Sequence, residues 1–179
     1  MADWRDDYLM TVAATFGVQR TLAERAIAQL SDDELLRTLG EEDNSIAVIM
    51  KHVGGNLRSR WTEPFTTDGE KEDRDRDGEF VVGGSDADVV RAVWERGWSV
   101  QERTLAAMTA DDLGRTLRIR GEPHTLVKAL ERSLAHTAQH VGQIILLAKH
   151  WKGQDWQTLS IPRGESARFA AVSPAPPRT

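Results

Sequence analysis

The sequence predicts an all-α fold, a four-helix bundle whose second and third helices are joined by a long crossover. Three observations lead to this prediction. Apolar residues recur at helical spacing in four long segments, and little of the chain alternates as a strand does. The 179 residues are enough for one domain with a substantial core. The connection from residue 62 to 85 is polar, Gly-rich and long enough to run back along the bundle, so that helices two and three can lie parallel.

The first two helices are predicted from their apolar faces and their ends. In the first, apolar side chains at spacings of three, four and seven lead from Tyr8 to Leu30, and the turn-like LSDDEL closes the segment. The second begins at Asn44 and Ser45, which are good N-cap residues. It ends before Pro64, because proline cannot continue a helix. Both segments are therefore long enough to span a bundle.

The last two helices are separated by a short segment of a different pattern. The third helix follows the cap region GGSDAD, and its apolar residues include Val89, Val90, Val93, Trp94 and Trp98. The fourth starts near Pro123 and has one apolar and one charged side as far as Lys149. Between them, LRIRGEPH alternates briefly, which favours a short extended piece or a hairpin.

The C-terminal part divides into two stretches. The segment WKGQDWQTLSIPRGESARF is too apolar for a loose tail, so we expect an ordered extension that packs on the bundle. Residues 1–170 are therefore predicted to form a single domain. Residues 171–179, which end in SPAPPRT, are predicted to be a disordered tail.

Composition narrows the classes of function. The chain carries 23 Lys and Arg against 28 Asp and Glu, a net charge of -5, which does not favour binding to nucleic acid or to an anionic membrane surface. The N-terminal MADWRDDYLM lacks the basic and apolar regions of a signal peptide, and the expected location is the cytoplasm. With no cysteine, the chain has no disulfide, no Cys-ligated zinc and no thiol nucleophile of its own.

Two histidines lie four residues apart in SLAHTAQHVGQ, within the fourth helix. His136 and His140 are about 40° apart around the helix and about 6 Å apart along it, so both rings can converge on one metal ion. His52 occupies the corresponding flank of the second helix and would supply a third ligand if the two helices are neighbours. Three polar side chains of these flanks are candidate pocket residues: Asn56, Ser133 and Gln143.

A second interpretation of the pair stays open, because two histidines at this spacing also occur at helix interfaces with their hydrogen bonds satisfied. His-Thr-Ala-Gln-His lacks the Glu that follows the first His in zinc proteases. The fourth helix also lacks the Glu-x-x-His of di-iron bundles. His124 and His150 lie at the ends of that helix, where cap or solvent roles are expected, and they are left out of the site.

Two other features have competing explanations. The stretch DRDRDG matches the opening of a calcium loop, but Gly84 stands where the bidentate Glu belongs, so we expect the charges from Asp73 to Glu79 to pair with one another or with the bundle. Gly54 and Gly55 lie inside the second helix at a cost of about 1 kcal/mol each. Close packing is favoured over a role in giving substrate access to His52.

Several long stretches resemble a known superfamily: SIAVIMKHVGGNLRSRWTEPFTTDGEK, RDRDGEF, LVKALERSLAHTAQHVGQIILLAKH and WQTLSIPRGES. The sequence resembles the DinB-like (YfiT-like) superfamily of metal-binding four-helix bundles, and within it a group of uncharacterised bacterial proteins. The resemblance implies metal ligands at His52, His136 and His140, a parallel arrangement of helices two and three, and a homodimer. The helical pattern had grouped the same three histidines.

The resemblance also sets expectations for function. Three imidazoles leave a coordination position for water or substrate, which is typical of catalytic centres. The implied cofactor is a divalent metal ion, Zn or Ni first, with Fe, Co or Mn as alternatives. Because relatives in the superfamily include thiol-dependent enzymes, the expected activity is a metal-dependent thiol S-transferase or a hydrolase acting on a small molecule, with a low-molecular-weight thiol as a partner. The alternative is a non-catalytic, metal-stapled dimeric protein with a stress-related or interaction role.

Overall fold

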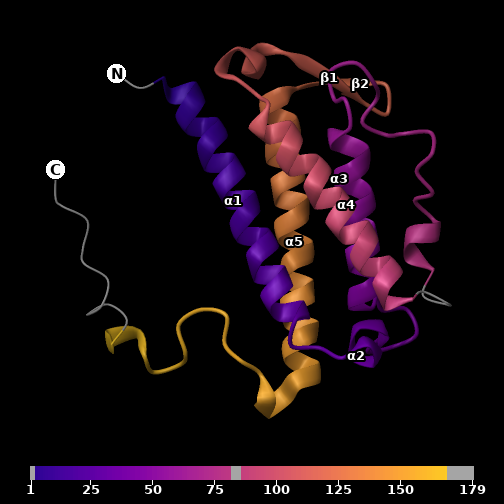
Figure 1. Cartoon of the computed structure of the whole chain (residues 1–179), viewed down its shortest axis with the longest axis vertical. Coiled ribbons are helices and arrows are strands. Elements are labelled where there is room, and N and C mark those ends of the chain that lie inside the picture. The colour runs from indigo at the N-terminus through magenta and orange to yellow at the C-terminus, as the bar shows by residue number, and fades with distance from the viewer. Residues whose placement is uncertain (1–2, 82–85, 169–179) are drawn as a thin grey trace.

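The computed structural model describes residues 3–81 and 86–168, which are mostly helical with one small two-stranded sheet (Figure 1). The α-helices are α1 (Trp4–Ile27), α2 (Asp32–Leu36), α3 (Ile46–Trp61), α4 (Ala87–Ala106) and α5 (Leu126–Lys152). Short 3₁₀ helices are η1 (Gly78–Phe80), η2 (Ala110–Gly114) and η3 (Gly153–Asp155). The strands β1 (Thr116–Ile119) and β2 (Glu122–Thr125) pair antiparallel.

The strand pair corrects the strictly all-α expectation and confirms the hairpin predicted at LRIRGEPH. Ile119 pairs with Glu122, so the turn contains only Arg120 and Gly121. Their φ values of 56° and 77° are both positive, as a type I′ hairpin turn requires. Because residues 122–125 belong to β2, α5 begins at Leu126 rather than near Pro123.

The helix starts are fixed by side-chain caps. The predicted cap Ser45 accepts a hydrogen bond from the Val48 amide at the start of α3. The stretch LSDDEL, expected to be a turn, contains all but the last residue of the five-residue helix α2, which begins with a capping box between Ser31 and Glu34. Val89 was predicted among the apolar residues of the third helix, but it is 57% exposed at the first turn of α4.

The four long helices form two parallel pairs. Helices α3 and α4 run in the same direction, from the α2 end toward the hairpin, as the long crossover predicted, while α1 and α5 both run the opposite way (Figure 1). The α3–α4 crossing is close: a Cβ added to Gly97 of α4 would lie 2.6 Å from the Cα of Gly54. Glycine is therefore needed where the two backbones meet.

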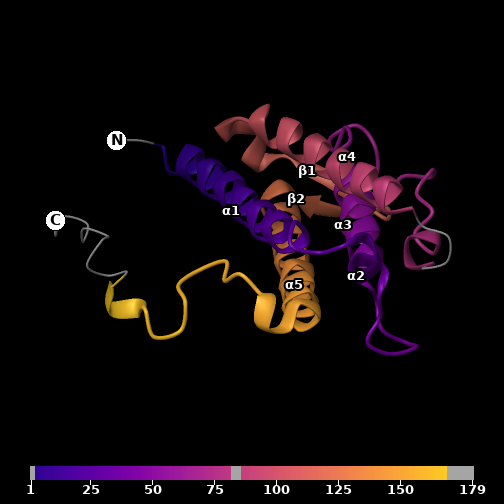
Figure 2. The ribbon, with the colours of Figure 1, turned by 60° about the horizontal axis from the view of Figure 1, so that its bottom comes forward.

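The crossover between α3 and α4 is anchored to the hairpin. Asp68 accepts hydrogen bonds from the amides of Arg120 (2.8 Å) and Gly121 (2.7 Å), and the Gly69 amide donates to the carbonyl of Arg118 (2.7 Å). Ser59 of α3 donates to the carbonyl of Gly69. In Figures 1 and 2 the hairpin lies at the end of the molecule where α3 ends and α5 begins. The crossover, the hairpin and these two helices thus form one polar corner.

The core lies between the long helices, and its largest fully buried side chains include Phe16, Leu35, Met50, Trp61 and Trp98. The C-terminal extension packs on this core through the partly buried Trp156 and Leu159. The predicted tail, residues 171–179, lies outside the described residues, and the boundary at residue 170 stays a prediction. In the described ranges, no helix is both long and apolar enough to cross a membrane.

Candidate metal centre

Three histidines from two helices meet between α3 and α5, beside the crossover. His52 comes from α3, and His136 and His140 come from α5. The ring centroids of His52 lie 5.1 Å from His136 and 5.0 Å from His140, and those of His136 and His140 are 4.5 Å apart. One nitrogen from each ring falls within 4.8 Å of the others. Within residues 3–81 and 86–168, no other group of three or more His, Asp or Glu side chains meets this condition.

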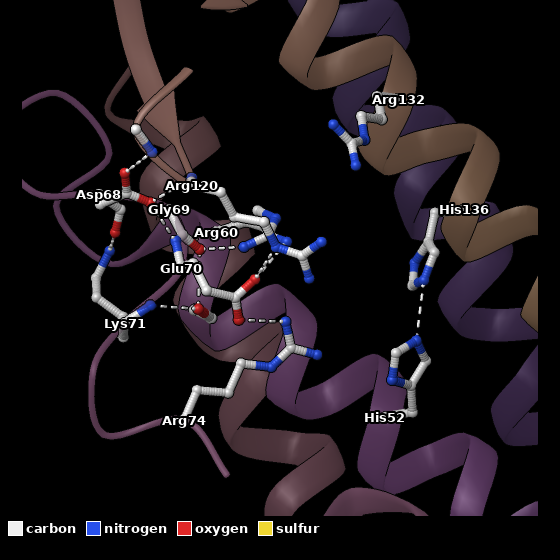
Figure 3. Close-up of polar contacts among 12 residues, drawn as sticks. His52, Arg60, Asp68, Gly69, Glu70, Lys71, Arg74, Arg120, Arg132 and His136 are labelled. Atoms are coloured by element: carbon white, nitrogen blue, oxygen red, sulfur yellow. Dashed lines mark hydrogen bonds and ion pairs between the residues drawn. The ribbon is translucent and has the colours of Figure 1, made fainter. Parts of the chain in front are cut away.

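The spacing of these nitrogens fits ligands of one metal ion. The Nε2 atoms of His52 and His136 are 3.0 Å apart and face each other across the gap between the helices (Figure 3). Two nitrogens that each lie about 2.0–2.1 Å from one metal are separated by roughly 2.9–3.4 Å for coordination angles between octahedral and tetrahedral. The donor set, three imidazoles without cysteine, suits Zn, Ni, Fe or Co.

A buried carboxylate orients His52. The Nδ1 atom of His52 lies 3.0 Å from Oε2 of Glu79, a residue of η1 in the crossover. Arg74 donates two hydrogen bonds of 2.8 Å to the same carboxylate. Burial raises the pKa of Glu79, but the hydrogen bonds from His52 and Arg74 outweigh it and hold the pKa below its usual value. The ionised Glu79 therefore accepts a hydrogen bond from the Nδ1–H of His52, which leaves Nε2 of that ring to face the cluster.

The other two rings are also held for ligation. His140 pairs through Nδ1 with Oε1 of Gln143 at 2.8 Å, which leaves its Nε2 free for a metal. Burial, together with the neighbouring His140 and His52, lowers the pKa of His136 to about 3. Burial also lowers the pKa of His140, against the effect of the hydrogen bond that its Nδ1 donates to Gln143. Both rings are therefore neutral near pH 7, which is the form that binds metal.

A cavity of about 200 Å³ opens beside the cluster, and His52 and His136 form part of its wall. Of the three candidate pocket residues, Asn56 and Ser133 line this cavity. Gln143 does not line it, and its side chain instead forms a hydrogen bond with Nδ1 of His140. Ser133 accepts a hydrogen bond of 3.2 Å from the indole nitrogen of Trp61, which fixes the position of its oxygen.

The sequence analysis included Arg74 and Arg76 only in the charged patch of the crossover and did not predict the other three arginines of this cavity: Arg60, Arg120 and Arg132. The sequence positions of two cavity arginines could have indicated that they lie near the histidines. Arg60 lies eight residues after His52 in α3, and Arg132 lies four residues before His136 in α5, so each shares a helix face with a histidine. The other three come from the crossover and the hairpin turn, which no sequence spacing connects to the histidines.

The charged patch of the crossover pairs as expected, while Gly84, the position at which a calcium loop would need its Glu, lies outside the described residues. Asp73 forms an ion pair with Arg58 at 3.0 Å, and Asp75 accepts a hydrogen bond from the Gly78 amide. Glu79 points the other way, to His52 and Arg74. The patch thus contributes to the rim of the histidine cluster through its last residue.

The two glycines of α3 have different neighbours. A Cβ on Gly54 would lie 2.6 Å from the backbone oxygen of Val93 in α4, so Gly54 serves packing, as predicted. A Cβ on Gly55 would lie 2.8 Å from Cδ of Glu79. Gly55 therefore leaves room for the carboxylate that orients His52, a role that the sequence analysis did not consider.

The comparisons with known proteins assign a family without an activity. A family model described as a protein of unknown function (DUF1572) matches residues 3–165. The comparison with curated proteins gives no match. The matched region contains all three histidines and every arginine of the cavity.

Proposed function

Since the chain belongs to the DUF1572 family, whose description names no activity, we propose a function from the site itself: a divalent-metal-dependent enzyme that acts on a small molecule. His52, His136 and His140 are the metal ligands, and the fold is a four-helix bundle of the DinB-like type. The observation that carries the proposal is the convergence of three imidazole nitrogens within 4.8 Å at the wall of a cavity.

The cavity favours a catalytic role over a structural one. Structural metal sites are closed by four protein ligands, whereas catalytic sites keep a position open for water or substrate. The cluster supplies three histidines, and two of them face a cavity rather than a packed core. The alternative, a metal that only staples α3 to α5 in a stress-related or interaction protein, would not need this cavity.

The residues of the cavity limit the reaction class. Those that line it within the described part of the chain include no Asp or Glu, and the hydroxyl of Ser133 is not a base near neutral pH. The chain therefore supplies no general base there beyond its histidines. A bound divalent metal supplies Lewis acidity, which lowers the pKa of a water or thiol. Hydrolysis by water or transfer to a small cellular thiol fits this arrangement, and a chain without cysteine needs an external thiol.

The experiment compares protein reconstituted with Zn or Ni with the same protein carrying His140→Ala. Loss of a reactive electrophile is followed with and without each of several small thiols. Thiol-dependent loss that His140→Ala abolishes supports the transferase, and thiol-independent loss with the same sensitivity supports the hydrolase. Absence of both activities, with metal bound, would favour the structural role.

The remaining expectations accompany this proposal. The metal is Zn or Ni, and the location is the cytoplasm. The protein is a homodimer, as the superfamily resemblance implies. Several apolar side chains of α1 are exposed, among them Trp4 and Met10 at 68% and 71%. A second copy would cover such a surface. A solution mass equal to one chain at all concentrations would contradict the dimer.

A further inference from the structure

The cavity beside the histidines is lined by five arginines. Arg60 projects from α3, Arg132 from α5, and Arg120 from the hairpin turn. Arg74 and Arg76 come from the crossover. In Figure 3, Arg60, Arg74 and Arg120 lie on one side of the view, and Arg132, His136 and His52 lie on the other, across an open space. Four separate segments thus direct guanidinium groups to one place.

Carboxylates neutralise only part of this charge. Glu70 pairs with Arg60 at 3.1 Å, with Arg74 at 3.1 Å and with Arg120 at 2.9 Å. Glu79 pairs with Arg74 at 2.8 Å. The two carboxylates therefore form ion pairs with three guanidinium groups, which leaves one positive charge in excess among these five residues.

The other two guanidinium groups have no acidic partner in the described residues. Arg132 lies 3.4 Å from the ring nitrogen Nε2 of His124, which is not an acidic group. The Cζ atom of Arg76 lies over the ring of Phe80, 5.4 Å from its centroid. The cavity therefore keeps an excess of positive charge.

Such an arrangement recognises an anion. Arginine presents several donors in a planar fork that matches carboxylate and phosphate oxygens, and grouped arginines gain little from one another unless an anion joins them. Arg60 is largely buried and keeps its charge in place through Glu70 and the carbonyl of Gly69. The ion pairs of Glu70 hold Arg60 and Arg120 at one wall of the cavity.

The other lining residues of the cavity indicate the size and polarity of the rest of the ligand. Trp61, Leu117, Ile119 and Ala129 give the cavity an apolar side. Its volume of about 200 Å³ is below the 300–1,000 Å³ range of drug-sized sites, so the ligand is small.

We propose that this cavity binds a small organic acid, whose carboxylate or phosphate group is held by Arg132, Arg120 and Arg76 while a short apolar part lies against Trp61 and Ile119. The acid is the substrate class of the metal-dependent reaction, so this part of the inference rests on the proposed function. The recognition of the anion by the arginines does not need the metal, and the two can be tested separately.

The experiment measures binding by isothermal titration calorimetry with three probes: inorganic phosphate, succinate and the uncharged succinamide. Each probe is titrated into metal-loaded and metal-free protein. The parent is compared with Arg132→Gln and with the control Arg103→Gln, which removes the same charge from an exposed arginine of α4 outside this cavity. Circular dichroism during heating reports whether each variant folds.

The expected result is that phosphate or succinate binds the parent and succinamide does not. Arg132→Gln weakens anion binding by about tenfold or more, because a charge-assisted hydrogen bond is lost, and Arg103→Gln leaves it within about twofold. Succinamide binding as tightly as succinate, or equal anion binding by Arg132→Gln and the parent, would overturn the inference. If Arg132→Gln does not fold, Arg76→Gln in the exposed crossover takes its place with the same expectation.

The two proposals fail in different ways. Arginine-dependent anion binding to a protein that takes up no Zn or Ni would support the anion site and overturn the metal-dependent function. Metal uptake without any binding of phosphate or succinate would support the metal centre and overturn the anion site.

Discussion

Glu79 connects the crossover to the histidine cluster at the scale of single residues. Its carboxylate accepts from His52 on one side and from Arg74 on the other, and it is 9% exposed. Gly55 leaves the space that this carboxylate occupies. His52 is therefore oriented by groups more than twenty residues away in the chain, although its own position comes from α3.

Replacing Glu79 with Gln tests this orientation. The amide keeps the shape but loses the charge that holds the Nδ1 proton of His52 and that Arg74 requires. We expect metal affinity to fall by about 10–100-fold, as is typical when such a partner of a ligating histidine is removed. Competition with a chelator measures the affinity. The control Glu72→Gln removes an exposed carboxylate of the same crossover, and an equal fall in this control would contradict the role of Glu79.

Two kinds of contact hold the elements together. One is the close crossing of two helix backbones, and the other is a set of hydrogen bonds to one carboxylate, here called the clasp. The crossing of α3 and α4 depends on Gly54 and Gly97, whose backbones touch. The clasp is Asp68, which ties the crossover to the turn of the hairpin through the amides of Arg120 and Gly121. The crossing aligns the helix that carries His52, and the clasp fixes the wall that carries Arg120.

Gly97→Ala tests the crossing. The new methyl would lie 2.6 Å from the Cα of Gly54, so the helices must separate, at a cost of about 1–3 kcal/mol in the free energy of unfolding. In the control Gly17→Ala the methyl meets nothing within 4 Å, and the higher helix propensity of alanine should raise stability by up to about 1 kcal/mol. Chemical denaturation of both variants gives the comparison, and stabilisation by Gly97→Ala would contradict the close crossing.

Asp68→Asn tests the clasp and its dependence on pH. Burial raises the pKa of Asp68, but hydrogen bonds from the Glu70, Gly121 and Arg120 amides outweigh it and hold the pKa below its usual value. The contribution of Asp68 is therefore complete above the ordinary Asp pKa of about 3.9 and is lost as pH falls through the lower pKa of the folded state.

We expect Asp68→Asn to cost about 1.5–3 kcal/mol of stability at neutral pH, because the asparagine NH₂ group cannot accept the bond from the Gly121 amide. The difference from the parent should be constant from about pH 7 to pH 5 and shrink below about pH 4. Urea unfolding at a series of pH values measures it. A difference that grows as the pH falls would mean that Asp68 is not bound as an ionised carboxylate.

At the scale of the whole molecule, the sequence predicted what repeats along the chain. Helical spacing located α1, α3, α4 and α5 and grouped His52 with the pair on α5, and alternation located the hairpin. The five-residue α2 was missed because so short a helix has no periodic face. Glu79 and Arg74 were predicted only as charges that pair within the crossover or with the bundle, and Arg120 was not predicted at all, because a 25-residue connection and a hairpin turn bring them to the site through tertiary contacts.

The central claim is that the three histidines bind one metal ion, and elemental analysis of the purified untagged protein tests it most directly. The parent is measured beside His140→Ala and beside His150→Ala, a control that removes an exposed histidine of the same helix outside the cluster. The account predicts about one Zn or Ni per chain in the parent and in His150→Ala, and little in His140→Ala, since two remaining imidazoles bind weakly. No metal in the parent after reloading with Zn or Ni would contradict it and leave the histidines as a hydrogen-bonded part of the helix interface.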